Sequence, residues 1–151
     1  MNRQLKVLFK EQGNIVHSVS GDASIKKAVG IMNKYLIGAL MVLNFDGDIE
    51  GIITEKDVMK KLASTDDLVG HLPVHSIMTP REKLIIGSGN DTIDHLMNVM
   101  TENNIRHIPI IDEDGVLQGI LSMRDIIKIL LEDTTQKVRY LNDYIMGRYP
   151  A

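Results

Sequence analysis

Apolar residues in the first part of the chain recur at two spacings, one helical and one typical of strands. Positions three or four apart predict an amphipathic helix, which Ser24 can cap at its start. Its inward face comprises Ile25, Ala28, Val29, Met32 and Leu36. Apolar runs over 39–43 and 49–53, separated by Asp46-Gly47, predict a β-hairpin. A short strand over 15–19 precedes the helix, and another helix is expected from Thr54 to about Leu62.

The same order of elements follows a second time. We expect a strand over 83–86, a helix from Thr92 to about Asn103, strands over 108–111 and 116–121, and a helix from Ser122 to Leu131. The inward residues of the first of these helices are Ile93, Leu96, Met97 and Met100. Asp114-Gly115 marks the turn of a second hairpin.

One seven-residue phrase links the two halves. Gly51-Ile52-Ile53-Thr54-Glu55-Lys56-Asp57 corresponds to Gly119-Ile120-Leu121-Ser122-Met123-Arg124-Asp125, at an offset of 68 positions that continues without a gap into the flanking residues. A gapless repeat indicates two copies of one supersecondary unit, and neither copy is expected to bury its apolar face alone. We therefore predict an α+β fold in which two β-α-β-β-α repeats pack together with pseudo-two-fold symmetry.

The repeat divides the chain into three parts. Residues 1–65 hold a lead-in, with a short helix expected over 4–12, and the first repeat, whereas residues 74–132 hold the second repeat. Residues 133–151 are expected to form a C-terminal helix with Val138, Leu141 and Ile145 on one face. This helix is expected to pack on the pair of repeats or on a second subunit.

Composition narrows the classes of function. The chain has 151 residues, of which 44% are hydrophobic and 25% charged, with a net charge of −3 and no cysteine. It has neither the basic stripe of a nucleic-acid surface nor an apolar run long enough to cross a bilayer. The absence of cysteine excludes disulfides and favours a cytoplasmic protein. Pro73 lies between His71 and His75 and breaks the helix that could align them on a metal, so no metal site is expected.

The repeated phrase admits two interpretations. An ionised Asp only accepts hydrogen bonds, so Asp57 and Asp125 could each accept both hydroxyls of a ribose. The hydroxyl residue three positions earlier and the first N–H groups of the helix could meet an anion, and the basic residue before each Asp could add charge. However, Thr-x-x-Asp and Ser-x-x-Asp also resemble a capping box, in which hydroxyl and acid satisfy backbone donors. Spacing alone favours the capping box, and the two interpretations are compatible.

The element order, the doubled phrase and Ile105-Arg106-His107-Ile108-Pro109-Ile110 resemble a pair of cystathionine β-synthase (CBS) domains, the Bateman module. The likeness covers nearly the whole chain and is closest to small stand-alone bacterial CBS pairs. In that family, the cleft between the repeats binds adenosine-containing ligands. The resemblance therefore implies a regulatory adenine-nucleotide sensor without catalysis, with AMP as the first ligand and ADP, ATP, NAD or S-adenosylmethionine as alternatives.

The resemblance also assigns residues to the ligand. It places Thr54, Asp57, Ser122, Asp125, Arg106 and His107 near ribose and phosphate. Lys56 and Arg124 join this group as the basic residues that precede each Asp. Those near adenine or lining the cavities are Ser18, Val19, Ser20, Ile37, Gly38, Ala39, Ile86, Gly87, Ser88, Ile108 and Pro109. The first repeat has Gly38-Ala39 where the second has Arg106-His107, so we expect unequal sites.

Stand-alone pairs of this family carry no effector domain. The resemblance thus implies a homodimer, formed through exposed helices and the tail, that acts on a separate and unidentified effector protein. Two rival functions remain from the residues alone. One is a purely structural dimerisation module whose capping boxes meet no ligand. The other is a nucleotide-hydrolysing enzyme, for which the sequence offers no evident base or metal site.

Overall fold

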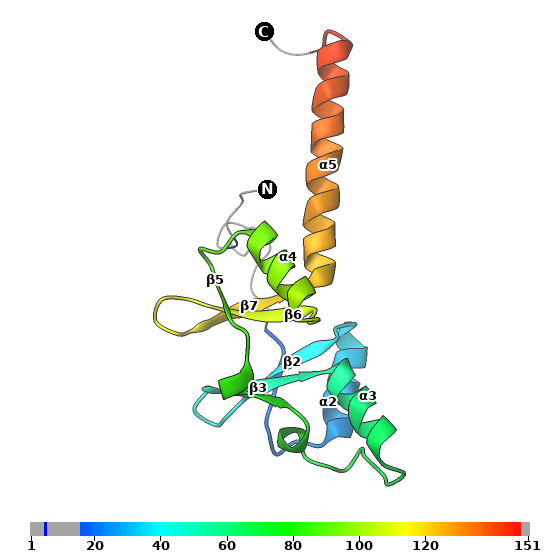
Figure 1. The fold of residues 1–151 in the computed structure, drawn as a ribbon, viewed down its shortest axis with the longest axis vertical. Coiled ribbons are helices and arrows are strands. Elements are labelled where there is room, and N and C mark those ends of the chain that lie inside the picture. The colour runs from blue at the N-terminus through cyan, green and yellow to red at the C-terminus, as the bar shows by residue number, and fades with distance from the viewer. Residues whose placement is uncertain (1–4, 6–15, 149–151) are drawn as a thin grey trace. The chain divides into compact units, whose positions relative to one another are not determined.

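The computed structural model describes Leu5 and residues 16–148, and these fall into two compact units. The first unit holds residues 16–86, and the second holds residues 87–148 together with Leu5. Each unit has its own sheet (Figure 1). Each unit also has its own apolar core. The predicted α+β class is therefore confirmed, with one repeat in each unit.

A four-stranded sheet forms the centre of the first unit. Its strands are β1 (Ser18–Val19), β2 (Ala39–Leu43), β3 (Ile49–Thr54) and β4 (Thr79–Pro80), in that spatial order. β1 is parallel to β2, whereas β3 is antiparallel to both β2 and β4. The helices are α2 (Ile25–Tyr35) and α3 (Glu55–Ser64), with short 3-10 turns at Val74–Ser76 and Arg81–Lys83.

α2 packs on alternate residues of β2. Ala28 and Met32 of the helix share a core with Leu40 and Val42 of the strand. Residues two apart on a strand point to the same face, so this pair meets the helix together. Ser24 caps the helix as predicted, with its side chain accepting from the Lys27 N–H at 3.1 Å.

Two residues predicted on the inward face of α2 lie outside it. Val29 is 40% exposed and Leu36 is 76% exposed. Leu36 ends the helix in the left-handed conformation, with φ 54°, and its N–H donates to the Met32 carbonyl. The inward face is therefore narrower than the apolar pattern predicted, and it stops one turn earlier.

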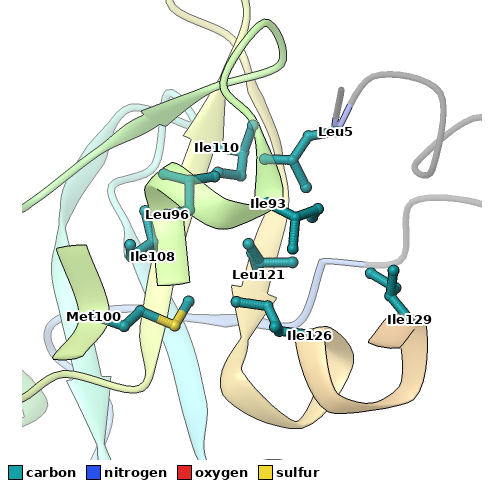
Figure 2. Packing of buried hydrophobic residues seen from close by; sticks show 9 residues of the cluster. All are labelled: Leu5, Ile93, Leu96, Met100, Ile108, Ile110, Leu121, Ile126 and Ile129. Atoms are coloured by element: carbon teal, nitrogen blue, oxygen red, sulfur yellow. The ribbon is translucent and has the colours of Figure 1, made fainter. Parts of the chain in front are cut away.

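A three-stranded sheet and two helices form the second unit. The strands are β5 (Gly87–Ser88), β6 (His107–Ile111) and β7 (Leu117–Ser122), and the helices are α4 (Ile93–Glu102) and α5 (Met123–Ile145). Figure 2 shows the core, where residues of α4, β6, β7 and α5 converge. Its fully or almost fully buried members are Leu5, Ile93, Leu96, Met100, Ile108, Ile110, Leu121, Ile126 and Ile129. The predicted inward residues Ile93, Leu96 and Met100 are thus confirmed, and Met97 packs partly buried against them.

The division between the units differs from the predicted domain boundaries. Leu5, expected with the first repeat, lies with 0% exposure in the core of the second unit. Residues 74–86, expected with the second repeat, belong to the first unit, because β4 pairs with β3. The rest of the helix expected over 4–12 lies outside the described residues.

The two hairpins repeat one another in register. Ala39 pairs with Thr54 in the first unit and His107 pairs with Ser122 in the second, at the same offset of 68 that the sequence shows. Each hairpin has its irregularity at the equivalent place, between Val42 and Leu43 or between Ile110 and Ile111. The gapless repeat of the sequence is therefore a repeat of backbone pairing.

Both predicted hairpin turns form at an Asp-Gly pair. Gly47 and Gly115 have positive φ values of 86° and 78°, which glycine adopts without steric penalty. Each glycine N–H closes the turn, donating to the carbonyl of Asn44 at 3.1 Å or of Asp112 at 3.0 Å.

The strand predicted over 83–86 does not form. Residues 81–83 make a 3-10 turn, and the strand begins only at Gly87. In the first unit, the Met41 N–H extends the parallel pairing by donating to the His17 carbonyl at 3.2 Å. Its counterpart in the second unit is Pro109, which has no N–H to donate. The parallel pairing is consequently displaced by one residue toward the carboxyl end.

α5 is one continuous helix of 23 residues, where two separate helices were predicted. The predicted break after Leu131 does not occur. The hydroxyls of Thr134 and Thr135 donate to the carbonyls of Leu130 and Leu131, both at 2.9 Å, which is compatible with helical backbone. No glycine or proline stands between residues 123 and 145 to end the helix earlier.

Candidate ligand site

The first copy of the repeated phrase forms a capping box at the start of α3. Thr54 is the N-cap residue, with extended backbone at φ −121°. Its N–H donates to Asp57 Oδ2 at 2.9 Å, and the Asp57 N–H donates back to Thr54 Oγ1 at 3.4 Å. The Thr54 hydroxyl also donates to Asp57 Oδ2 at 3.1 Å. The Asp57 carboxylate thus satisfies a backbone N–H at the start of its own helix.

The second copy forms the same box at the start of α5. The Ser122 N–H donates to Asp125 Oδ2 at 2.9 Å, and the Asp125 N–H donates to Ser122 Oγ at 3.1 Å. The interpretation that spacing alone favoured is therefore confirmed in both repeats. Because a negative charge near a helix N-terminus is favourable, both carboxylates also interact well with the helix dipole.

One oxygen of each carboxylate stays outside the cap. The capping bonds use only Oδ2, and Oδ1 of Asp57 and of Asp125 has no hydrogen-bond partner among the residues that the structure describes. Both side chains are half-buried. An ionised carboxylate can accept more bonds than the cap supplies, so the box does not exhaust its capacity.

The sheet register brings the predicted cavity segments to these caps. The Glu55 N–H donates to the Gly38 carbonyl at 3.0 Å, and Ala39 pairs with Thr54. In the second unit, the Met123 N–H donates to the Arg106 carbonyl at 2.8 Å. In each unit, a hydroxyl, a carboxylate and the segment that leads into the first strand of the hairpin therefore lie together at the start of a helix.

Positive charge is unequal between the two clusters. Lys56 and Arg124 are exposed at equivalent positions in the first turn of each helix. Arg106, also exposed, and the half-buried His107 add to the second cluster, where the first has Gly38 and Ala39. The side chains around the two caps therefore differ in charge, and the inequality of the two ligand sites stays a prediction.

The residues predicted near adenine in the first unit line a separate cavity. Its volume is about 340 Å³, and it lies at the end of β1 and β2 beside the start of α2. Its walls are formed by Ser18, Val19, Ser20, Lys27, Ile31, Leu43, Asn44, Phe45 and Gly47. Sequence reasoning missed Lys27, Asn44 and Phe45. Phe45 could have been found in the sequence as an aromatic residue beside a hairpin turn. Its side chain is fully exposed in the structure.

This cavity lies away from the cap of the same unit. Val19 pairs with Val42, which is three residues along β2 from Ala39. At about 3.3 Å per residue this places the two groups about 10 Å apart along the strand. The structure therefore gathers Thr54, Asp57 and Ala39 into one cluster and leaves Val19 and its neighbours in another.

The equivalent residues of the second unit are mainly structural. Gly87 is buried, and a Cβ added to it would lie 2.6 Å from Ile110 Cδ1 and 3.1 Å from Leu96 Cδ2. The Ser88 hydroxyl accepts from the Asn90 N–H at 3.2 Å. Ser88 pairs with Ile111, about 13 Å along β6 from His107. Ile86 is 38% exposed.

Other predicted cavity residues also contribute to the cores. Ile37 packs against the first core, and Ile108 and Pro109 are buried in the second unit. In the described part of the chain, no group of three or more His, Cys, Asp or Glu side chains is placed to hold a metal ion. No helix among the described residues is long and apolar enough to span a membrane.

The fold and the doubled helix cap define a protein built from two CBS domains. The sequence model of the CBS domain family matches residues 14–64 and 69–132, so this chain belongs to that family. It is 33% identical over 131 residues to the CBS domain-containing protein CBSX3, mitochondrial, of Arabidopsis thaliana, covering 85% of this chain and 63% of the plant protein. The chain therefore spans somewhat less than two thirds of that relative.

Solved structures show the same fold. The CBS-domain containing protein ATU1752 from Agrobacterium tumefaciens is 35% identical, with a TM-score of 0.78 over 85% of this chain and 93% of that one. Two more distant neighbours carry ligands. The CBS domain pair of MJ0100, in complex with 5'-methylthioadenosine and S-adenosyl-L-methionine, has a TM-score of 0.74 at 24% identity, covering 88% of this chain and 99% of that one. CBSX2 in complex with AMP has a TM-score of 0.64 at 21% identity, covering 79% and 90%.

Proposed function

We propose that this chain is a non-catalytic regulatory module that binds an adenine nucleotide, with AMP as the first choice. ADP, ATP, NAD and S-adenosylmethionine are the alternatives. The main support is that Asp57 and Asp125 each use only one carboxylate oxygen, Oδ2, to cap a helix. Oδ1 of each accepts no hydrogen bond from the residues that the structure describes. The ligands named for the structural neighbours MJ0100 and CBSX2 all contain adenosine, which supports the choice of ligand class.

The proposed recognition follows from the geometry of the cap. The remaining oxygen, Oδ1, accepts hydroxyls of the ribose, while Oδ2 keeps the helix start closed. A hydrogen bond to a charged group contributes about 1.5–3 kcal/mol. A nucleotide that lacks the 2'-hydroxyl therefore loses a bond and is bound less tightly.

The second unit is the proposed stronger site for a phosphate. Arg106 and His107 adjoin the start of α5 beside Ser122 and Asp125, and Arg124 lies in its first turn. Guanidinium groups make charge-assisted hydrogen bonds to phosphate oxygens, which are roughly twice as strong as neutral ones. The first unit supplies Lys56 but no counterpart of Arg106.

As a sensor, the protein would respond only to a ligand that binds one of its conformations better than another. We further propose that it acts as a homodimer on a separate effector protein. A cytoplasmic location is also proposed, for which the cysteine-free composition is the support. The alternative that the capping boxes themselves favour is a structural dimerisation module without ligand.

A thermal shift with pure protein tests the proposal. AMP at 100-fold over its dissociation constant should add about 2.7 kcal/mol of stability, a rise in Tm of roughly 5–10 °C. The Tm rise should be smaller with 2'-deoxy-AMP and smaller again with GMP. No shift with any of the five adenosine ligands would favour the structural alternative, and turnover of ATP or NAD would favour an enzyme.

A pair of variants separates ligand binding from helix capping. Asp125→Ala removes the carboxylate that accepts the Ser122 N–H, and with it the proposed ribose contact, whereas the Ser122 hydroxyl stays in place. Thr92→Ala likewise removes one side-chain bond at a helix start in the same unit, because Thr92 Oγ1 accepts from the His95 N–H at 3.2 Å at the start of α4. Both should lose about 1 kcal/mol of stability. Only Asp125→Ala should weaken AMP binding, and equal AMP affinity in the two variants would contradict the proposal.

A further inference from the structure

The carboxyl-terminal half of α5 has no counterpart in the first repeat. α3 covers Glu55–Ser64, and the same offset of 68 would end α5 at residue 132, where the match to the CBS domain family also ends. The helix instead continues to Ile145. Every described residue from Thr134 to Arg148 is exposed.

An apolar seam runs along the exposed side of this helix. Its members are Ile127, Leu131, Thr134, Val138, Leu141 and Ile145. Their spacings alternate between four and three residues, which is the a/d pattern of a coiled coil. The five aliphatic members are 51–76% exposed. The hydroxyl of Thr134 is satisfied within its own helix, since it donates to the Leu130 carbonyl at 2.9 Å.

The seam is distinct from the face that holds α5 on its own unit. That face is formed by Ile126 and Ile129, which are buried in the core of the second unit (Figure 2). Figure 1 shows that the helix continues beyond the sheet of this unit. A helix that carries a second apolar stripe along its exposed length fits a partner helix with the same stripe.

We propose that α5 pairs with α5 of a second copy of this chain as a short parallel coiled coil along this seam. This inference rests on the homodimer proposed above and is independent of the ligand. The seam is self-complementary, as a two-fold symmetric interface between identical copies must be. At fewer than three heptads it is short, so the dimer should dissociate on dilution.

Charge selects the parallel arrangement. Lys137 occupies a g position, immediately before Val138 of the seam. In a parallel pair the facing e position is Asn142, which is neutral. An antiparallel pair that buries all six seam residues would place the two copies of Lys137 opposite each other across the symmetry axis. Like charges at that position are unfavourable.

Sedimentation equilibrium of the full chain tests the seam. At high concentration the wild type should have twice the chain mass of 16.9 kDa. On dilution its mass should fall toward that of the monomer. Leu141→Glu places a charge in the seam and should leave a monomer with unchanged circular dichroism and unchanged AMP response. Gln136→Glu adds the same charge on the opposite side of the helix and should stay dimeric. A dimeric Leu141→Glu variant would overturn the seam while leaving the proposed homodimer intact, and a monomeric wild type would overturn both.

Crosslinking tests the orientation, because the chain contains no native cysteine. In a parallel pair the two copies of residue 141 face each other at a distance that a disulfide can span. Leu141→Cys should therefore form a covalent dimer on mild oxidation, whereas Gln136→Cys should not. In the antiparallel pair Leu141 faces Leu131. Crosslinking by the double variant Leu131→Cys, Leu141→Cys, without crosslinking by Leu141→Cys alone, would contradict the parallel arrangement.

Discussion

Gly51 and Thr79 lie so close on neighbouring strands that Gly51 has no room for a side chain. A Cβ at this position would collide with the Thr79 carbonyl oxygen and would also lie 3.0 Å from the Met78 sulfur. The contact arises because β4 pairs with β3 at Gly51 and Ile52. The first residue of the repeated phrase is thus fixed by packing in the first unit, before any ligand is considered.

Gly51→Ala should therefore destabilise the first unit. The carbonyl is backbone and can move only if β4 shifts, so we expect a loss of about 1–3 kcal/mol in chemical denaturation. Gly30→Ala provides the control. Nothing lies within 4 Å of a Cβ added to Gly30, which is exposed inside α2. Alanine there should increase stability by about 0.5–1 kcal/mol. A neutral Gly51→Ala variant would show that β4 does not pack as described.

The caps can be tested without any ligand. Thr54→Ala and Ser122→Ala each remove the hydroxyl that accepts the third backbone N–H of a helix. Each variant should lose about 0.5–2 kcal/mol in urea denaturation. Thr54→Ser keeps the hydroxyl and should retain most of the stability. Equal losses for Thr54→Ala and Thr54→Ser would indicate that the methyl group matters more than the cap.

Leu5 is expected to stabilise the second unit. It is fully buried in that core, although it lies far from the rest of the unit in sequence. Leu5→Ala should cost about 2–5 kcal/mol, as for other large-to-small changes in a core. Leu68→Ala is the matched control, because Leu68 is 82% exposed. Its effect should stay within about 0.5 kcal/mol, and a similarly small effect of Leu5→Ala would contradict the described packing.

Arg106 should distinguish a nucleotide from a nucleoside. If it contacts phosphate, Arg106→Ala should weaken AMP binding and leave adenosine binding unchanged in isothermal titration. The loss should be about 1.5–3 kcal/mol, the usual contribution of a hydrogen bond to a charged group. Arg139→Ala, on the exposed part of α5, should change neither affinity. If the variant lost equal affinity for AMP and for adenosine, Arg106 would act by shaping the site and not by contacting phosphate.

Local signals in the sequence were sufficient for most of the elements. The Asp-Gly turns and the apolar runs beside them determine both hairpins, and Ser24 and Thr92 determine where two helices begin. The repeated phrase also predicted its own capping geometry, because hydroxyl and acid three residues apart have few other arrangements at a helix start. These features depend on residues close together in the chain.

Features that depend on distant residues were not predicted. The missing strand pairing at Ile86 follows from Pro109, more than twenty residues later. The burial of Leu5 depends on a core built from residues beyond position 90. The cavity beside Phe45 is formed by three segments that only the fold brings together. Sequence spacing carries no direct information on such contacts.

The reciprocal caps have a consequence for the rigidity of the carboxylates. Asp57 and Asp125 are each anchored through one oxygen to the backbone that precedes them. A partner that approaches the other oxygen meets a side chain that is already immobilised, so it does not bear the ordering penalty of about 0.5–1.5 kcal/mol for a flexible residue. Conversely, fraying of the first helical turn would release the carboxylate from its fixed position. Local unfolding of the helix start and loss of affinity for the bound partner would therefore occur together.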